Sequence, residues 1–160
     1  MTVAALDPPL VPPVADGQAT HTLSASHPPT GFVPHQVAGV AILLWATDPA
    51  EPARLATPFF HAAAAAAMDI PVEVYFSAKS VLLLKPGTAE ALLPNPRHPK
   101  TALDSIREAT GLGAKLFACS DALMAHGLGE LSLIAECQGR GGAVQFMARA
   151  ADHRWRTLVF

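Results

Sequence analysis

The stretch KLFACSDALMAHG, residues 115–127, decides how this chain folds. A short apolar run ends on Cys119, and the chain continues through Ser120 and Asp121, two residue types that favour the start of a helix. The segment that follows has helical composition and stops at Gly127, a residue type that often ends helices. This order predicts a buried strand, a tight turn and a short helix, with a thiol at the junction.

Cys119 therefore has two interpretations. The start of a helix favours negative charge, so a cysteine at this junction is expected to form the nucleophilic thiolate more readily. Free cysteines are also among the most buried residues and often act only as small hydrophobic side chains. The local sequence leaves both interpretations open.

Composition indicates one self-associating domain. The chain has 160 residues, of which 51% are hydrophobic and 15% charged, and its mean hydropathy is +0.30. Ordinary soluble domains carry about 25% charged residues. We therefore expect a homo-oligomer, because subunit contacts bury excess apolar surface. The longest apolar runs, at residues 37–46 and 62–68, are shorter than the roughly 20 residues that span a membrane, so no membrane association is expected.

Charge and cysteine content exclude several classes of protein. Net charge is −2, with 11 basic and 13 acidic residues and no basic patch, so nucleic acid is not an expected partner. The first basic residue is Arg54, and an N-terminus of this kind resembles neither a secretory signal nor a mitochondrial presequence. We therefore expect a cytoplasmic protein. Cys119 and Cys137 are too few for a disulfide scaffold and are expected to be free thiols.

Residues 1–36 differ from the rest of the chain. They hold seven of the 15 prolines and only two charged residues. Such a segment favours a disordered or extended arm, which leaves residues 37–160 as the folded domain. The spacing of the arm's histidines, His21, His27 and His35, fits no metal-binding signature, and no metal site is expected.

Strands and helices are predicted to alternate along residues 37–160. Strands are expected at residues 37–46, 72–77, 116–119 and 155–160. A further strand is expected either at 131–137 or, after a helical turn at 130–134, at 135–139. Helices are expected at about 48–68, 101–111, 122–126 and 144–151, with helical turns at 81–84 and 88–93. This alternation predicts an α/β fold with a mostly parallel five-stranded sheet and helices on both faces.

The sequence also predicts four details of the helices. Asp48 is expected to cap the first long helix, and Pro58 is expected to kink it. Thr101 and Asp104 are expected to form a capping box. Phe146 and Met147 are expected to be buried on the last helix.

Parallel sheets bind ligands beyond the C-terminal ends of their strands. Cys119, Ser77 and Lys79 are predicted to lie at that edge, with Ser120 at the adjoining helix start, so the last three are candidate substrate-binding residues. Lys79 is alternatively a solvated surface lysine. Cys137 is either a second thiol near Cys119 or a buried strand residue.

Glycines at 139, 141 and 142 flank Arg140 in a strand-to-helix turn. The turn lacks the glycine spacing of dinucleotide-binding loops and the lysine of phosphate-binding loops. A flavin or nucleotide domain is therefore disfavoured, and close packing of helix on strand is the simpler explanation of the glycines.

Three segments resemble the DsrE family of small α/β proteins: HAAAAAAMDIPVEVYFSAKSVLLLKPG, KLFACSDALMAHGL and the closing residues 141–160. The resemblance spans about residues 37–160. It implies a flavodoxin-like or YchN-like three-layer sandwich, trimers or hexamers, and persulfide-based sulfur relay in the cytoplasm. The family's conserved cysteine falls on Cys119, and a family glycine falls on Asp69. Some members have a second cysteine just after the first, but residues 120–122 are Ser, Asp and Ala, so a disulfide cycle within this motif is excluded.

The function that the resemblance implies is a sulfur carrier or sulfurtransferase. Cys119 would hold sulfane sulfur as a persulfide, and a partner thiol would remove the outer sulfur. The expected partners are sulfur donor and acceptor proteins or small sulfane-sulfur compounds, with no metal or organic cofactor. The alternative is a non-catalytic oligomeric binding module of the same fold, in which Cys119 is merely buried.

Overall fold

The structure is a computed structural model, and it describes residues 37–160. The predicted arm at residues 1–36, with its three histidines, lies outside the described residues. The strands are β1 (Gly39–Leu44), β2 (Val72–Phe76), β3 (Lys115–Ala118), β4 (Cys137–Arg140) and β5 (Trp155–Val159). The α-helices are α1 (Ala56–Ala66), α2 (Ala102–Gly111), α3 (Ser120–Ala125) and α4 (Ala143–Ala150), and 3₁₀ helices span Pro52–Arg54, Ala78–Leu84 and Ala89–Ala91.

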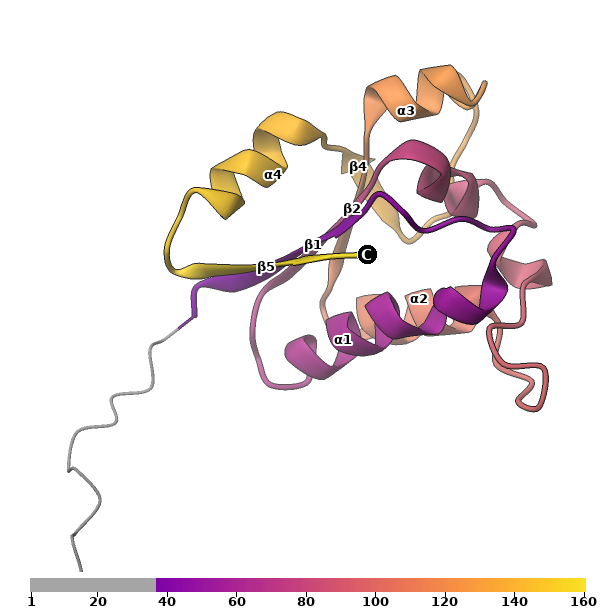
Figure 1. Ribbon diagram of the computed structural model, residues 1–160, viewed down its shortest axis with the longest axis horizontal. Helices are drawn as coiled ribbons and strands as arrows, with labels where there is room; N and C mark the ends of the chain where they lie inside the picture. The colour runs from indigo at the N-terminus through magenta and orange to yellow at the C-terminus, as the bar shows by residue number, and fades with distance from the viewer. Residues whose placement is uncertain (1–36) are drawn as a thin grey trace, which may run out of the picture. The chain divides into compact units, whose positions relative to one another are not determined.

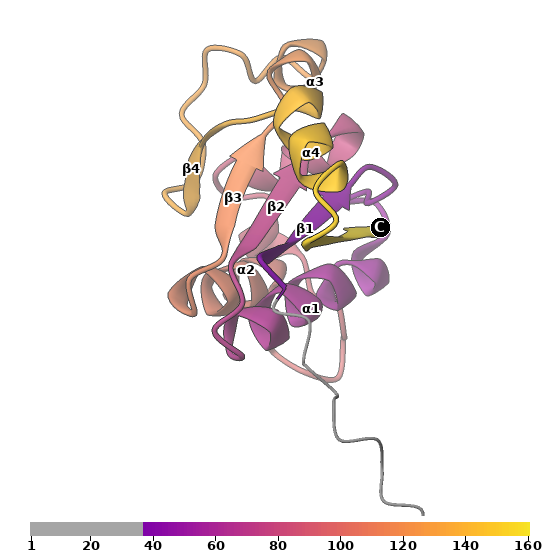
Figure 2. The same cartoon turned by 90° about the vertical axis from the view of Figure 1, so that its left-hand side faces the viewer.

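The strands form one sheet in the order β4-β3-β2-β1-β5, and each neighbouring pair is parallel. Helices α1 and α2 lie side by side on one face, and α4 lies on the other (Figure 1). Helix α3 lies beyond the ends to which the strand arrows point (Figure 2). The predicted α/β class, with a parallel five-stranded sheet between helical layers, is confirmed.

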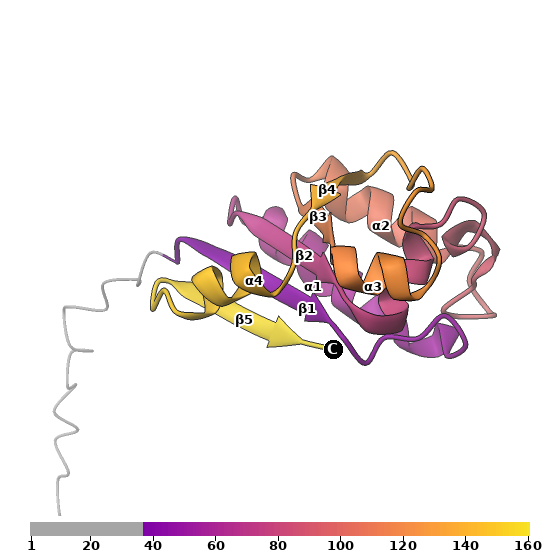
Figure 3. The same ribbon diagram turned by 90° about the horizontal axis from the view of Figure 1, so that it is seen from above.

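Alternation along the strands divides the side chains between the two faces of the sheet. One face packs on α1 and α2 and forms the main core. Its strand residues are Val40, Ile42, Leu44, Val72, Val74, Phe76, Leu116 and Ala118. The other face carries Leu43, Tyr75 and Phe117, and α4 is the helix that crosses it (Figure 3). Apolar runs such as that of β1 are continuous because both faces of the central strands are covered.

The first long helix begins later than the sequence predicted. A 3₁₀ turn at Pro52–Arg54 precedes α1, so Asp48 does not cap this helix; instead its Oδ1 accepts a hydrogen bond from the Ala50 N–H at 2.9 Å. Pro58 is the third residue of α1. The first four N–H groups of a helix have no partner within it, so a proline there breaks no hydrogen bond. The expected kink at Pro58 was therefore wrong.

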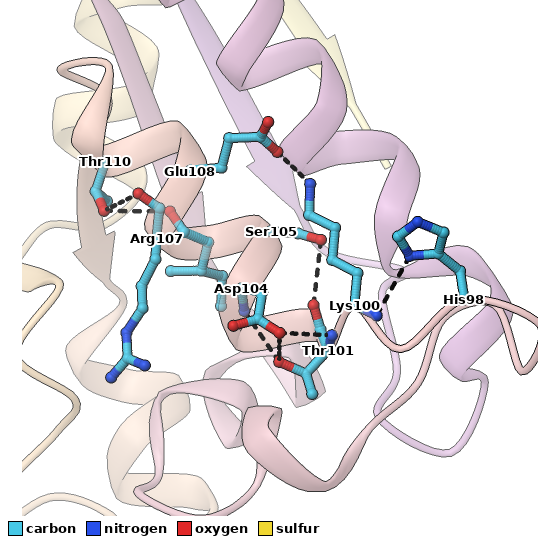
Figure 4. Close-up of polar contacts among 9 residues, drawn as sticks. His98, Lys100, Thr101, Asp104, Ser105, Arg107, Glu108 and Thr110 are labelled. Carbon is cyan, nitrogen blue, oxygen red and sulfur yellow. Dashed lines mark hydrogen bonds and ion pairs between the residues drawn. The ribbon is translucent and has the colours of Figure 1, made fainter.

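Helix α2 begins at the predicted capping box. The Asp104 N–H donates to Thr101 Oγ1 at 3.0 Å, and the Thr101 N–H donates to Asp104 Oδ2 at 2.9 Å (Figure 4). Two N–H groups at the helix start are thereby satisfied. Along the same helix Leu103, Ile106 and Ala109 are buried, and these positions share one face at helical spacing.

The position of β4 decides between the two alternative strands predicted after residue 130. Strand β4 starts at Cys137, later than the prediction of a strand at 131–137 and close to the alternative at 135–139.

On α4, Phe146 is only half-buried and Met147 is 57% exposed, so their predicted burial was wrong. Consecutive helical residues point about 100° apart and cannot both face the sheet.

Two of the described residues other than glycine, both in turns, adopt a left-handed backbone. Asp69, which follows α1, has φ of 59°, and Ala78, the second residue after β2, has φ of 48°. The position of Asp69 explains why a glycine suits the same place in the family that the sequence resembles, since glycine adopts this conformation without strain.

Within residues 37–160, no helix is long and apolar enough to cross a membrane. The same part of the chain contains no group of three or more His, Cys, Asp or Glu side chains placed to hold a metal ion.

Candidate functional site

Cys119 lies where β3 ends and α3 begins, as the sequence predicted. Its N–H donates to the Phe76 carbonyl of β2 at 2.9 Å, and its carbonyl accepts from the Leu123 N–H at 2.9 Å in the first turn of α3. One residue earlier, the Ala118 carbonyl accepts from the Gly141 N–H at 2.9 Å. The backbone that carries the thiol is thus held by β2 on one side and by the turn after β4 on the other.

A partly open cavity of about 290 Å³ has Cys119 in its wall. It lies beyond the C-terminal ends of the strands, as expected for a parallel sheet. Its walls are mainly apolar. They are formed by Leu43, Tyr75, Phe76, Ser77, Cys119, Gly141, Gly142, Ala143, Phe146 and Met147. Strands β1, β2 and β3, the turn after β4 and helix α4 therefore all contribute to the surroundings of one sulfur atom.

A second, more open cavity of about 360 Å³ also has Cys119 in its wall, and it shares Gly141, Gly142 and Ala143 with the first cavity. Its lining is more polar and includes Ser120, Asp121 and Arg140. Nη2 of Arg140 donates a hydrogen bond to the Gly129 carbonyl, which orients the guanidinium group. Cys119 is half-buried and lines both the mainly apolar cavity and the more open cavity, whose wall also contains Asp121 and Arg140.

Ser77 lies in the wall of the apolar cavity, at the predicted edge of the sheet. Its N–H donates to Ser80 Oγ at 2.9 Å, and the buried Ser80 hydroxyl in turn donates to the Leu44 carbonyl at 2.7 Å. These bonds tie the turn after β2 to the end of β1. Ser77 and Ser120 are thus both brought together with Cys119, one in each cavity.

Lys79 is placed differently. Its ammonium group forms an ion pair with Asp48 at 2.7 Å, and this partner raises the pKa of Lys79. Among the described residues, the side chains that line the two cavities around Cys119 do not include Lys79. This exposed pair matches the alternative of a solvated surface lysine.

Cys137 does not share a cavity with Cys119. It pairs with Leu116 in the sheet, three residues before Cys119 on β3, and it packs against the core on the α1–α2 face. Its Sγ lies 3.6 Å from the Gly139 carbonyl oxygen. Burial raises the pKa of the Cys137 thiol, and the contact with Gly139 only partly offsets this effect. This placement matches the interpretation of a buried strand residue.

Arg140 is the functional candidate that the sequence did not single out. The glycines at 139, 141 and 142 predicted only close packing of helix on strand for this turn. That role is real: a Cβ on Gly141 would lie 2.9 Å from the Cβ of Phe117. Because carboxyl ends of parallel strands meet at one edge, the basic residue at the end of β4 also had to lie near the end of β3.

Comparison with known proteins agrees with this fold. The crystal structure of the ychN protein from E. coli is similar, with a TM-score of 0.62. The two chains are 14% identical, and the match covers 76% of this chain and 98% of the ychN chain. At that identity the similarity is one of fold. A search of curated proteins found no match.

The family model described as DsrE/DsrF-like matches residues 40–160, which include strands β2 to β5, all but the first residue of β1, Cys119 and the residues that line both cavities. The match covers most of the chain, and it agrees with the resemblance that the sequence segments indicated. This protein therefore belongs to the DsrE/DsrF-like family.

Proposed function

We propose that this protein is a cytoplasmic sulfur carrier or sulfurtransferase that holds sulfane sulfur as a persulfide on Cys119 and passes it to a partner thiol. Membership of the family supports a sulfur-relay role. The single observation that carries the assignment to Cys119 is its place in the walls of two adjoining cavities, one mainly apolar and one more open. A carrier thiol needs both shelter for the bound sulfur and access for donor and acceptor.

Loading is an exchange at sulfur. The Cys119 thiolate attacks the sulfane sulfur of a donor, a new S–S bond forms, and the bond inside the donor breaks. With thiosulfate as donor, the leaving group is sulfite, which takes the electron pair of the broken bond. The product is the Cys119 persulfide, and the step requires no metal or organic cofactor.

Unloading repeats the exchange with a second thiol. An acceptor thiolate attacks the outer sulfur of the persulfide, and the bond to Cys119 Sγ breaks. Cys119 leaves as a thiolate and the acceptor becomes the persulfide. One cysteine is sufficient for this cycle, because donor and acceptor supply the other sulfur atoms. This requirement suits a chain in which Cys137 packs on the opposite face of the sheet.

Arg140 suits a role in attracting reactants. Donors such as thiosulfate and polysulfide are anions, and thiolates are anions too. An arginine beside the thiol stabilises negative charge, and its planar guanidinium group has several N–H donors to offer. Ser120 adds a hydroxyl to the same cavity, whereas the nearby carboxylate of Asp121 acts against anion binding.

Self-association is part of the proposal, as a homotrimer or homohexamer. Several large apolar side chains of the described residues are exposed, among them Val144 at 88% and Phe60 and Met68 at 70% each. Apolar surface of this kind is typical of subunit contacts. Light scattering on the purified protein tests this expectation, and a monomer at micromolar concentration would contradict it.

The exposed apolar surface also favours a second candidate, a non-catalytic oligomeric binding module. A transfer assay separates the two candidates. Protein treated with thiosulfate or polysulfide is freed of donor and mixed with a small thiol, and the transferred sulfane sulfur is measured. Wild type and Cys137→Ser are expected to transfer sulfur, whereas Cys119→Ser is expected to transfer none. Equal background transfer by all three proteins would favour the binding module.

A further inference from the structure

A buried carboxylate lies in the middle of the sheet. Glu73, on β2, is only 8% exposed, and its side chain lies on the face that α4 crosses. The Tyr75 hydroxyl donates to Glu73 Oε2 at 2.5 Å. Charged side chains are rarely buried unless they are paired. The role of Glu73 therefore depends on the group with which its carboxylate is paired.

That partner is Arg149 on α4. Its Nε donates to Glu73 Oε2 at 2.8 Å and its Nη2 donates to Oε1 at 2.9 Å, which is the two-pronged geometry of the strongest ion pairs. The guanidinium carbon also lies 4.4 Å from the ring centroid of Trp155 on β5, a cation–π contact. Arg149 therefore ties α4 to two strands of the sheet.

Helix α4 has few other attachments. None of its residues is buried, and Val144 and Met147 are exposed. The ring of Phe146 meets the ring of Tyr75 edge-on, with centroids 5.6 Å apart, and it forms part of the wall of the apolar cavity beside Cys119. Ala143 and Met147 complete the part of that wall that α4 supplies.

We infer that Glu73 and Arg149 are positioning residues, which hold α4 over Cys119 and so control how large a molecule reaches the thiol. The inference rests on the proposed function only in taking Cys119 as the working thiol. Neither residue lines the cavities around Cys119, so their effect passes through Phe146 and the rest of α4. Tyr75 supports Glu73 through its hydroxyl and Phe146 through its ring.

The test measures access to Cys119 in the full chain, without any sulfur donor. Alkylation of Cys119 is followed by mass spectrometry with a small reagent, iodoacetamide, and with a bulky aromatic maleimide. The quantity compared is the ratio of the bulky-reagent rate to the small-reagent rate. The main variant is Glu73→Leu with Arg149→Met, which removes the pair without leaving one charge buried alone. Arg154→Met, which removes an exposed ion pair with Asp152, is the matched control.

The double variant loses the two charge-assisted hydrogen bonds that tie α4 to the sheet. Its rate ratio is expected to rise roughly tenfold, the factor that corresponds to the net contribution of one such bond. Phe146→Ala, which removes the cavity wall directly, is expected to raise it to a similar extent. The Arg154→Met control is expected to keep the wild-type ratio. An unchanged ratio in the folded double variant, with Phe146→Ala raising it, would overturn the inference.

A milder series keeps the inference testable if the double variant does not fold. Tyr75→Phe keeps the ring but removes the hydroxyl that holds Glu73, and Arg149→Lys keeps the charge but loses the two-pronged contact. Both are expected to raise the ratio about threefold, a part of the full effect of the pair. If both fold and neither changes the ratio, the pair serves stability alone. Because no sulfur transfer is involved, this outcome is distinct from failure of the proposed persulfide.

Discussion

Gly142 faces Cys119 at the start of α4. A Cβ on Gly142 would lie 3.8 Å from the sulfur of Cys119, an ordinary contact distance, and the backbone there is extended, with φ of −130° and ψ of −152°. Any residue can adopt such a conformation. The missing side chain therefore leaves one approach to the sulfur open, and it does so without a conformational need for glycine.

Gly142→Ala is expected to fold normally but to slow the loading of Cys119 by thiosulfate. The added methyl group occupies the approach to the sulfur, and a tenfold slower reaction corresponds to about 1.4 kcal/mol in the barrier. The matched control is Gly139→Ala, because a Cβ at Gly139 meets no atom within 4 Å. Mass spectrometry of samples quenched at set times measures both loading rates. Equal rates for the two variants would show that thiosulfate does not reach the sulfur of Cys119 past Gly142.

The two cysteines are expected to differ in reactivity. Burial raises the pKa of Cys137, so less of its thiolate is present at neutral pH than in an unfolded chain. Alkylation of Cys137 in the native protein is therefore expected to be slow at pH 7 and to accelerate as the pH rises through the raised pKa. Peptide mapping after timed alkylation, in the native state and in urea, checks this. Equal rates for Cys137 in both states would contradict it.

Glu73 is expected to make the free energy of unfolding depend on pH in the acid range. Burial raises the pKa of Glu73, but the bonds from Arg149 and Tyr75 outweigh burial and leave the pKa below its usual 4.5. A lowered pKa in the folded state stabilises the protein above the usual pKa, and this contribution disappears as the pH falls through the folded value. Glu73→Gln is therefore expected to lower the free energy of unfolding by about 2 kcal/mol at pH 7.

The same difference between wild type and Glu73→Gln is expected to shrink in acid. Below the lowered pKa the wild-type carboxyl is protonated and resembles the amide of glutamine. Urea unfolding at pH 7 and near pH 3 measures both differences. If the free energies of unfolding of wild type and Glu73→Gln differ by the same amount at both pH values, the charge of Glu73 contributes nothing to stability.

Ala78→Gly is expected to stabilise the protein. A left-handed backbone costs a residue with a side chain about 1–2 kcal/mol, and Ala78 has φ of 48°. Glycine avoids this cost but loses roughly 0.5–1 kcal/mol through its freer unfolded chain, so a net gain of about 0.5–1 kcal/mol is expected. Ala64→Gly, on the exposed side of α1, is the control and is expected to destabilise. A loss of stability in Ala78→Gly would contradict the interpretation of strain at this position.

Much of the fold was predictable because local signals agreed with the tertiary structure. The apolar runs of β1 and β2 and the Thr101–Asp104 capping box each specified one element. Strand β4 was harder, since its sequence CQGR has no apolar alternation and its pairing comes from β3. The start of α1 was misplaced because the prolines at 52 and 58 fit two different helix starts.

The candidate site was predictable only in part. Cys119, Ser77 and Ser120 followed from the ends of successive elements. The pair of Glu73 and Arg149 was not accessible in the same way, because its members are 76 residues apart and nothing local links them. The sequence did not indicate the role of Arg140, because the glycines around it are typical of close packing alone. Long-range pairing and the crossing of α4 over the sheet are properties of the folded chain.

The most direct test of Cys119 as a sulfur carrier is the intact mass of the protein after incubation with thiosulfate or polysulfide. The proposed function predicts a gain of one sulfur atom, about 32 Da, on wild type and on Cys137→Ser. The gain is expected to be absent from Cys119→Ser and to be removed by a reductant. Absence of the adduct on folded wild-type protein with either donor, or its presence on Cys119→Ser, would contradict the assignment.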